Sequence, residues 1–210
     1  VSSINTYYKD RGFLDIRVDR AIEISPDQRE AKVIFLIEEG LEFTVGSVTS
    51  TPKYADEELR VFSAEQLQAL MELKVGDRYK TDILQRSKQE LESAYGVLGY
   101  LDADVQLLPV RSGSTNEVNV IIEVSEGGIA DVGLININGN FLTKDKVIRR
   151  HVKLQSGRRY DATELEQSRE RIMQTQLFNE VKVTVQQEDE DHPMQRDVLI
   201  EVKEKNTGSF

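Results

Sequence analysis

The 210-residue chain contains 37 acidic and 27 basic side chains, which gives a formal net charge of −10 at pH 7. This charge disfavours nucleic acid and anionic membrane surfaces as partners, because both attract basic proteins. The absence of cysteine excludes disulfides and thiolate metal sites and is compatible with an oxidising compartment, and no apolar run approaches the roughly 18 residues of a membrane-spanning helix.

Residues 1–41 are expected to form one helix and a β-hairpin. Ile4 and Tyr8 follow a helical spacing before Gly12, and the strands DIRVDRAIEI and AKVIFLIEE flank the polar turn SPDQRE. Val1 opens directly into polar sequence without a secretory signal, so we interpret the chain as a fragment of a longer protein.

Residues 42–126 predict the order strand, helix, helix, strand, strand. A strand is expected in EFTVGSVTS, a short helix in SAEQLQALMELKVG, a longer helix in KTDILQRSKQELESAYGVLGY, and a hairpin in LDADVQLL and EVNVIIEVSE. Ser63 and Asp82 are expected to cap the two helices at their N-termini, and Gly99 is expected to end the second.

Residues 127–205 predict the same order again. A strand in IADVGLININGN precedes a short helix in TKDKVIRRHVKLQSG, a longer helix in YDATELEQSRERIMQTQ, and a hairpin in LFNEVKVTVQ and DVLIEVKEK. Thr143 is expected to cap the short helix, and Asp161 or Thr163 the longer one.

A short sequence motif, which we call the repeated word, recurs between the long helix and the hairpin of each segment. It reads GFLDIRV at residues 12–18 and GYLDADV at 99–105, and in the third segment Phe178 follows Leu177 where the glycine stood. A period of about 80 residues is that of a small domain. We therefore predict an α+β fold of tandem small domains in β-α-α-β-β order, each a three-stranded mixed sheet covered on one face by two helices.

This order and these words resemble the polypeptide-transport-associated (POTRA) domain. The resemblance rests on ININGN, which ends at Asn140, on the pair of helices, and on the residues GY or LF between the second helix and the next strand. In addition, VKEKNTGSF at 202–210 resembles the junction between the last such domain and a β-barrel. Two departures are the insertion TPKYADEELRVF, which replaces the NGN turn in the middle segment, and Leu177. The resemblance implies the C-terminal part of one POTRA domain at 1–41, complete domains at 42–126 and 127–205, and a barrel junction at 206–210.

The resemblance also implies a function. In the family, such domains lie on the periplasmic side of the bacterial outer membrane, bind unfolded outer-membrane proteins and accessory assembly lipoproteins, and precede the parent's own C-terminal β-barrel, with no cofactor and no enzyme activity. Two alternatives stay open: a rigid spacer that docks a single accessory protein without client contact, and the periplasmic part of a two-partner secretion or organelle import pore.

The family arrangement puts the final strand at the centre of each sheet and leaves the strand after the second helix at an edge. A free edge offers unpaired N–H and C=O groups to which an extended client can add by β-augmentation. The expected client-binding residues are Ile16, Val18, Ala103, Val105, Leu107, Val181, Val183 and Val185.

A second candidate is the local basic cluster VIRRH, in which Arg149 and Arg150 are expected to dock an acidic accessory protein. His151 lies at a predicted helix end, where a positive charge would be favoured. The acidic run EDED at 188–191 lacks the spacing of a calcium loop, and His192 follows it in a predicted turn. We predict no catalytic, metal-binding or cofactor-binding residues.

Overall fold

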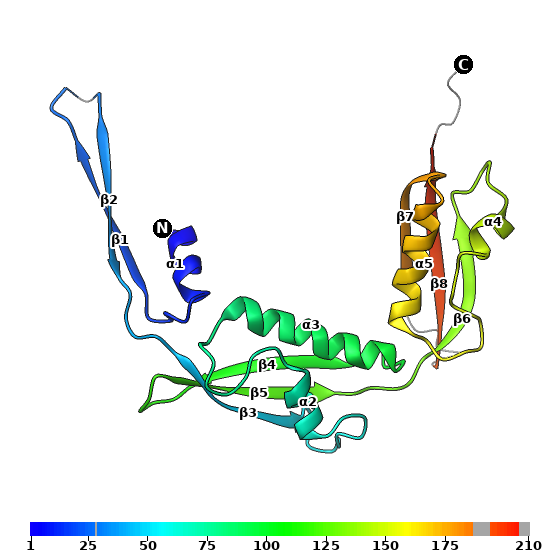
Figure 1. Cartoon of the computed structure of the whole chain (residues 1–210), viewed down its shortest axis with the longest axis horizontal. Helices are drawn as coiled ribbons and strands as arrows, with labels where there is room; N and C mark the ends of the chain where they lie inside the picture. Colours follow the sequence, from blue (N-terminus) through cyan, green and yellow to red (C-terminus); the bar gives the residue numbers. More distant parts are fainter. Residues whose placement is uncertain (28, 187–193, 206–210) are drawn as a thin grey trace. The chain divides into compact units, whose positions relative to one another are not determined.

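The computed structural model describes residues 1–27, 29–186 and 194–205 (Figure 1). It confirms an α+β chain whose strands form a two-stranded sheet, β1-β2, and two three-stranded sheets, β3-β5-β4 and β6-β8-β7. Contacts divide the chain into two compact units, Val1–Leu91 with Val105–Ser125 and Glu92–Asp104 with Glu126–Phe210. None of the helices in the described residues is long and apolar enough to cross a membrane.

The first set of elements is a helix and an antiparallel hairpin, as predicted. The hairpin pairs Val18 with Ile37 and leaves large apolar side chains on the second strand exposed, including Phe35 and Leu36. A two-stranded sheet without a covered face is marginal on its own. The elements are α1 (Ser2–Lys9), β1 (Arg17–Ile24) and β2 (Ala31–Glu38).

The middle repeat has the predicted order, with the last strand in the centre of the sheet. Strand β5 pairs in parallel with β3 and lies beside β4. One side of β5 is completely buried, through Val118, Val120, Ile122 and Val124, because the helices cover that face. The elements are β3 (Thr44–Pro52), α2 (Ala64–Leu70), α3 (Thr81–Val97), β4 (Asp104–Arg111) and β5 (Glu117–Ser125).

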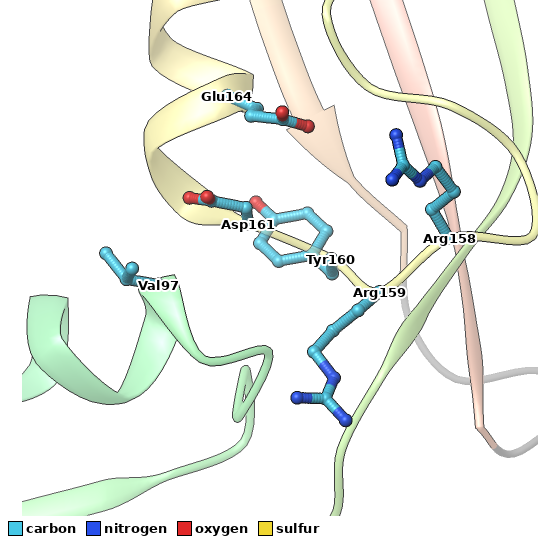
Figure 2. A pocket seen from close by; sticks show the side chains of 6 residues that line it. All are labelled: Val97, Arg158, Arg159, Tyr160, Asp161 and Glu164. Carbon is cyan, nitrogen blue, oxygen red and sulfur yellow. The ribbon is translucent and has the colours of Figure 1, made fainter.

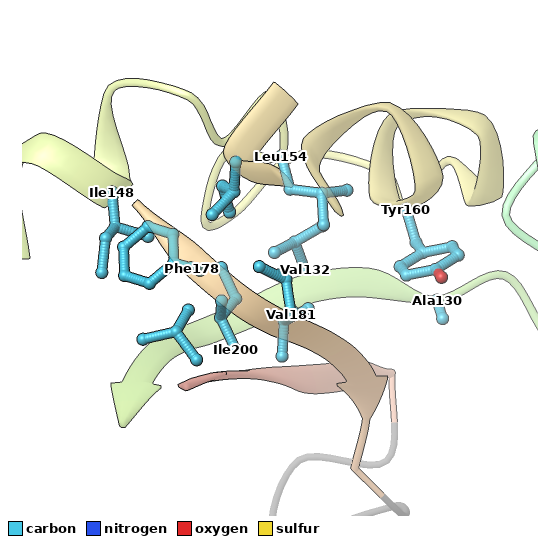
Figure 3. Close-up of a cluster of buried hydrophobic side chains, with 11 residues drawn as sticks. Ala130, Val132, Ile148, Leu154, Tyr160, Phe178, Val181 and Ile200 are labelled. Carbon is cyan, nitrogen blue, oxygen red and sulfur yellow. The ribbon is translucent and has the colours of Figure 1, made fainter. Parts of the chain in front are cut away.

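The third repeat follows the same plan. Strand β8 is central, parallel to β6 and antiparallel to β7. Its core gathers side chains of both helices and all three strands, with Phe178, Ile172 and Ile200 almost fully enclosed (Figure 3). The elements are β6 (Asp131–Asn138), α4 (Asp145–Arg149), α5 (Ala162–Gln174), β7 (Phe178–Val185) and β8 (Gln195–Glu204).

The helix starts were predicted with mixed success. Ser63 caps α2 in a reciprocal capping box with Gln66, and the Asp161 carboxylate accepts the Thr163 N–H at 2.7 Å. Two expectations were wrong: Asp82 lies inside α3, and Lys144 rather than Thr143 precedes α4. Helix α4 is also much shorter than the predicted 143–157, since it ends at Arg149.

Each complete repeat ties its two helices together with one buried serine. The Ser87 hydroxyl accepts the N–H groups of Glu72 and Leu73, and the Ser168 hydroxyl accepts the Lys153 N–H at 2.9 Å. These contacts satisfy backbone groups just after the shorter helix, which would otherwise be buried without partners.

The third repeat lacks the glycine of the repeated word because it turns the chain one residue earlier. Gly12 and Gly99 both have φ +89°, whereas in the third repeat the left-handed residue is Gln176, with φ +59°. Leu177 can therefore replace the glycine without entering a conformation that β-carbon sterics disfavour.

Candidate functional site

The outer edge of the first strand of each complete sheet is partly covered by the chain itself. In the middle repeat the Val45 N–H donates to the Asp77 carbonyl, and the Gly76 N–H donates to the Val45 carbonyl, both at 2.8 Å. In the third repeat Val132 makes the matching bonds with residues 157 and 158. The start of β3 and of β6 is thus closed to another strand.

The same two strands are interrupted by a bulge that a side chain of the central strand fills. The register shifts after Val45 and after Val132. At the second bulge the Leu134 N–H donates to the Asp197 carboxylate at 2.7 Å, and Asn119 occupies the corresponding place beside Ser47. Bulges are a common protection of sheet edges.

The outer edge of β7, the β7 edge, pairs in continuous register with β8 from Glu180 to Val185, and its register shift lies at the start of the strand, between Phe178 and Glu180. The Gln186 N–H donates to the Asp197 carbonyl at 2.8 Å, and hydrogen-bonded pairs alternate along an antiparallel ladder. Even-numbered residues of β7 therefore bond to β8. The backbone groups that point away from β8 belong to Val181, Val183 and Val185.

The outer edge of β4, the β4 edge, has the same alternation. The Ser112 N–H donates to the Glu117 carbonyl at 2.9 Å, so even-numbered residues bond to β5. The groups that point away from β5 belong to Val105 and Leu107. The Ala103 N–H instead donates to the Tyr100 carbonyl at 3.4 Å. Pro109 has no N–H, so the usable edge ends at Leu108. Ala103 itself lies just before β4.

On β1 the Ser25 N–H donates to the Glu30 carbonyl, so even-numbered residues point outward. Val18 is one of them, whereas Ile16 lies before the strand and is buried. All the predicted edge residues thus stand at outward-facing backbone positions or directly before a strand.

At two of these positions on the β4 and β7 edges the side chain is too buried to contact a client, whereas Leu107 and Val183 are half-buried. Val105 and Val181 are 0% and 6% exposed, because their side chains point into the core of their own repeat. What the two edges present is main chain held in place by buried side chains. Such an edge can bind an extended segment without reading its sequence.

The repeated word contacts the chain just before the first strand of the next repeat. We call this contact a joint rather than a binding site. In the first compact unit the Gly12 carbonyl accepts the Phe43 N–H, and in the second the Gly99 carbonyl accepts the Ala130 N–H at 2.8 Å. A Cβ at Gly99 would lie 2.9 Å from Arg159 Cγ, so only glycine fits beneath that side chain. Arg78 covers Gly12 in the same way.

The aspartate of the word adds an ion pair to each joint. Asp15 pairs with Arg111 at 2.6 Å, and Asp102 pairs with Arg196 at the same distance. Arg196 is buried, so its guanidinium requires this partner. The predicted word therefore has a structural role in both places.

A pocket of about 250 Å³ lies at the second joint, between the ends of α3 and α5 (Figure 2). Burial, and then the charge of Asp161, raises the pKa of Tyr160 to about 12, so this tyrosine stays neutral at physiological pH. The pocket is smaller than most small-molecule sites. It is lined by Val97, Arg158, Arg159, Tyr160, Asp161 and Glu164.

The basic cluster is only partly available. Arg149 pairs with Asp145 at 2.9 Å and donates to the Ile135 carbonyl, while the Arg150 Nε–H donates to His151 Nε2 at 3.3 Å. Burial, and then the neighbouring Arg150, lowers the pKa of His151, which opposes the positive charge that a helix end favours. Arg150 is the more accessible candidate for docking.

The remaining sequence candidates add no site. The acidic run at 188–191 and His192 lie outside the described residues. Within the part of the chain that the structure describes, no group of three or more acidic or histidine side chains is placed to hold a metal ion.

A family model described as "POTRA: Surface antigen variable number repeat" matches residues 57–127 and 130–205. The chain is 24% identical over 183 residues to the outer membrane protein assembly factor BamA of Neisseria meningitidis serogroup B, covering 87% of this chain and 22% of that protein. It is also 24% identical over 212 residues to BamA of Nitratidesulfovibrio vulgaris, covering 100% of this chain and 26% of that protein. The chain therefore spans about a quarter of the length of these relatives.

Two solved structures share the fold. Haemophilus influenzae BamA POTRA3-5 superposes with a TM-score of 0.74 at 20% identity, over 97% of this chain and 78% of that one. BamA from Haemophilus ducreyi lacking POTRA domains 1-3 gives 0.68 at 22% identity, over 80% of this chain and 30% of that one. Because the family model matches more than half of the chain, in both repeats, the chain belongs to the POTRA family, with domains of the kind that BamA contains.

Proposed function

We propose that this chain is a periplasmic binding and scaffold region of an outer-membrane protein assembly factor. Its relatives are named as such factors. The observation that carries the client-binding part of the proposal is the unpaired main chain of the β4 and β7 edges, in sheets whose opposite edges are bulged and partly covered by the chain itself. Unfolded β-barrel proteins would add an extended segment to these edges by β-augmentation.

The strength of such an edge suits temporary binding. About four ladder hydrogen bonds at roughly 0.5–1.5 kcal/mol each give roughly 2–6 kcal/mol before the cost of ordering the client. This corresponds to about millimolar affinity or weaker for one edge. Binding at both edges by one client would raise the effective affinity, and release would need no energy source.

Proline substitution on the β7 edge tests the proposal. Val183→Pro removes an outward N–H and places a ring on the free edge, while Val183→Ala shortens the same half-buried side chain and keeps the N–H. The probe is a synthetic ten-residue peptide of alternating apolar and polar residues, titrated to millimolar concentration and followed by amide chemical shifts.

We expect shifts along β7 with the unchanged chain and with Val183→Ala, and none at β7 with Val183→Pro. A fold check by thermal unfolding accompanies both variants. Leu107→Pro and Leu107→Ala repeat the comparison on β4. Equal binding by the proline and alanine variants, or shifts confined to the helices, would show that the edges do not take up client strands.

We further propose Arg150, with Arg149 beside it, as a docking point for an acidic accessory lipoprotein. Arg150 is exposed and lies on a basic segment of an otherwise acidic chain. A pull-down with Arg150→Glu is expected to lose the accessory protein, whereas Lys9→Glu, which reverses an exposed charge on α1, is expected to keep it. If only this loss occurs and the peptide binds neither edge, the rigid-spacer function is the better description.

A further inference from the structure

The loop between β6 and α4 exposes two large apolar side chains. Phe141 is 93% exposed and Leu142 is 82% exposed, more than any other large apolar side chain in the described residues. We call this pair the apolar tip. Single exposed apolar residues are common on protein surfaces, but two adjacent ones at this exposure suggest an interaction surface.

The apolar tip is held in a defined conformation. The Glu204 carboxylate accepts the N–H of Leu142 at 2.9 Å and the N–H of Thr143 at 2.6 Å. The Asn140 side-chain amide donates to the Thr143 carbonyl at 3.0 Å. The loop backbone is therefore fixed to the end of β8 while the two apolar side chains project from it, which lowers the entropic cost of binding.

Basic side chains follow the apolar tip directly. Between residues 141 and 150 the chain has four cationic side chains and one anionic one, Asp145, which pairs with Arg149. Lys144 and Lys146 are exposed and form no ion pair with any residue that the structure describes. An apolar pair beside unpaired lysines is typical of segments that bind at a membrane interface.

The middle repeat does not have this feature. The two residues before Ser63 are Val61 and Phe62, which match the apolar tip in position before Thr143, yet both are half-buried. The helix that follows has Glu65 in its first turn and no basic residue in its last turn. Of the two complete repeats, only the third therefore combines an exposed apolar pair with basic side chains at this position.

We propose that the apolar tip, with Lys144 and Lys146, contacts the surface of an anionic phospholipid bilayer. The assignment rests on the proposed function and on the membrane-embedded barrel that the family resemblance implies C-terminal to the third repeat. The loop and the end of β8 lie at the same end of the third sheet (Figure 1). The chain's net charge of −10 does not prevent this contact, because charges beyond about 10 Å are screened at physiological salt.

A bilayer fits the tip better than a protein partner does. The two side chains are almost fully exposed, and such side chains insert into the interfacial region of a bilayer without a matching cavity. The lysines then lie where anionic headgroups attract them. A protein partner is kept as an outcome of the test.

The chain has no tryptophan, so one introduced tryptophan reports its own site. Phe141→Trp is the reporter, and Tyr54→Trp, at an aromatic position that is 52% exposed in the middle repeat, is the matched control. Vesicles of phosphatidylethanolamine with phosphatidylglycerol are compared with vesicles of phosphatidylcholine alone. We expect a blue-shifted emission and quenching by brominated lipid for Phe141→Trp on the anionic vesicles, and neither for Tyr54→Trp.

Loss variants complete the test. Phe141→Ser with Leu142→Ser, and separately Lys144→Glu with Lys146→Glu, are each expected to lower vesicle binding by about tenfold. Both double variants should keep the peptide binding of the β7 edge, which separates this proposal from the proposed function. Unchanged vesicle binding in the double variants, an equal shift at position 54, or a shift of the reporter only when a protein partner is added would each overturn the membrane assignment.

Discussion

The middle and third repeats end their central strands with the same sequence pattern but use its last glutamate differently. IEVSE ends at Glu126, and IEVKE ends at Glu204. In the middle repeat the Tyr95 hydroxyl donates to the largely buried Glu126 carboxylate at 3.1 Å. In the third repeat the Glu204 carboxylate holds the backbone of Leu142 and Thr143.

One residue of the long helix accounts for this difference. Tyr8 and Tyr95 each stand five residues before the aromatic residue of the repeated word, and Tyr8 bonds to Glu39 as Tyr95 does to Glu126. The third repeat has Met173 at this distance, which supplies no hydroxyl. The same strand end can therefore stabilise either a helix or a loop, and in the third repeat it orders the loop that carries the apolar tip.

The largest effect is expected from the turn that makes this loop possible. Gly139 has φ +86°, and a Cβ there would overlap the Val202 carbonyl oxygen of β8. Gly139→Ala must displace the strand or the loop, so we expect a loss of about 3 kcal/mol or more in the free energy of unfolding. Gly157→Ala is the control, since its φ is +79° with open space around it, and should cost about 1–2 kcal/mol. Equal losses in urea denaturation would show that the close approach to Val202 is unimportant.

The next effect concerns the glutamate of the middle repeat. Tyr95→Phe removes the hydroxyl that donates to Glu126, whose carboxylate lies in a largely buried position. We expect a loss of about 1–3 kcal/mol, because a buried charged acceptor loses a partner. Tyr8→Phe, whose partner Glu39 is exposed, should cost less than about 1 kcal/mol. A larger loss for Tyr8→Phe would contradict this account.

A smaller effect is expected from acid on the third repeat. Hydrogen bonds from Thr143, and then from the Leu142 and Phe141 backbone, lower the pKa of Glu204. Because the folded-state pKa is lowered, the ionised carboxylate stabilises the loop at pH values above the ordinary pKa of a glutamate, about 4. This stabilisation is lost as the pH falls through the folded-state pKa. The amide signals of Leu142 and Thr143 should therefore titrate below about pH 4. In Glu204→Gln these signals should not titrate, and a titration that persists would assign it to another group.

The order of strands and helices was predictable from sequence because it depends on local patterns. The central place of the final strand, and with it the free edges, was implied by the family resemblance, and the apolar residues on both faces of EVNVIIEVSE and DVLIEVKEK agree with it. The loop was not predictable, since Glu204 reaches it across more than 60 residues of sequence. The same carboxylate also explains why Thr143 failed as a cap, because the Thr143 side chain is hydrogen-bonded to Glu204 and not to the first turn of α4. The basic cluster VIRRH was visible in the sequence, but the exposure of Phe141 and Leu142 just before it was not.

The smallest effect tests how the third repeat dispenses with glycine in its repeated word. Gln176 is exposed and has φ +59°, a conformation that costs a residue with a β-carbon about 1–2 kcal/mol relative to glycine. Gln176→Gly should relieve this strain, but glycine also loses more backbone freedom on folding, by roughly 0.5–1 kcal/mol. We therefore expect a net stabilisation of at most about 1 kcal/mol in urea denaturation. Leu177→Gly is the control and should destabilise the chain, since the left-handed turn lies one residue earlier. If Leu177→Gly instead stabilised the chain, the left-handed residue in solution would be at position 177, which corresponds to Gly12 and Gly99 in the other two repeats.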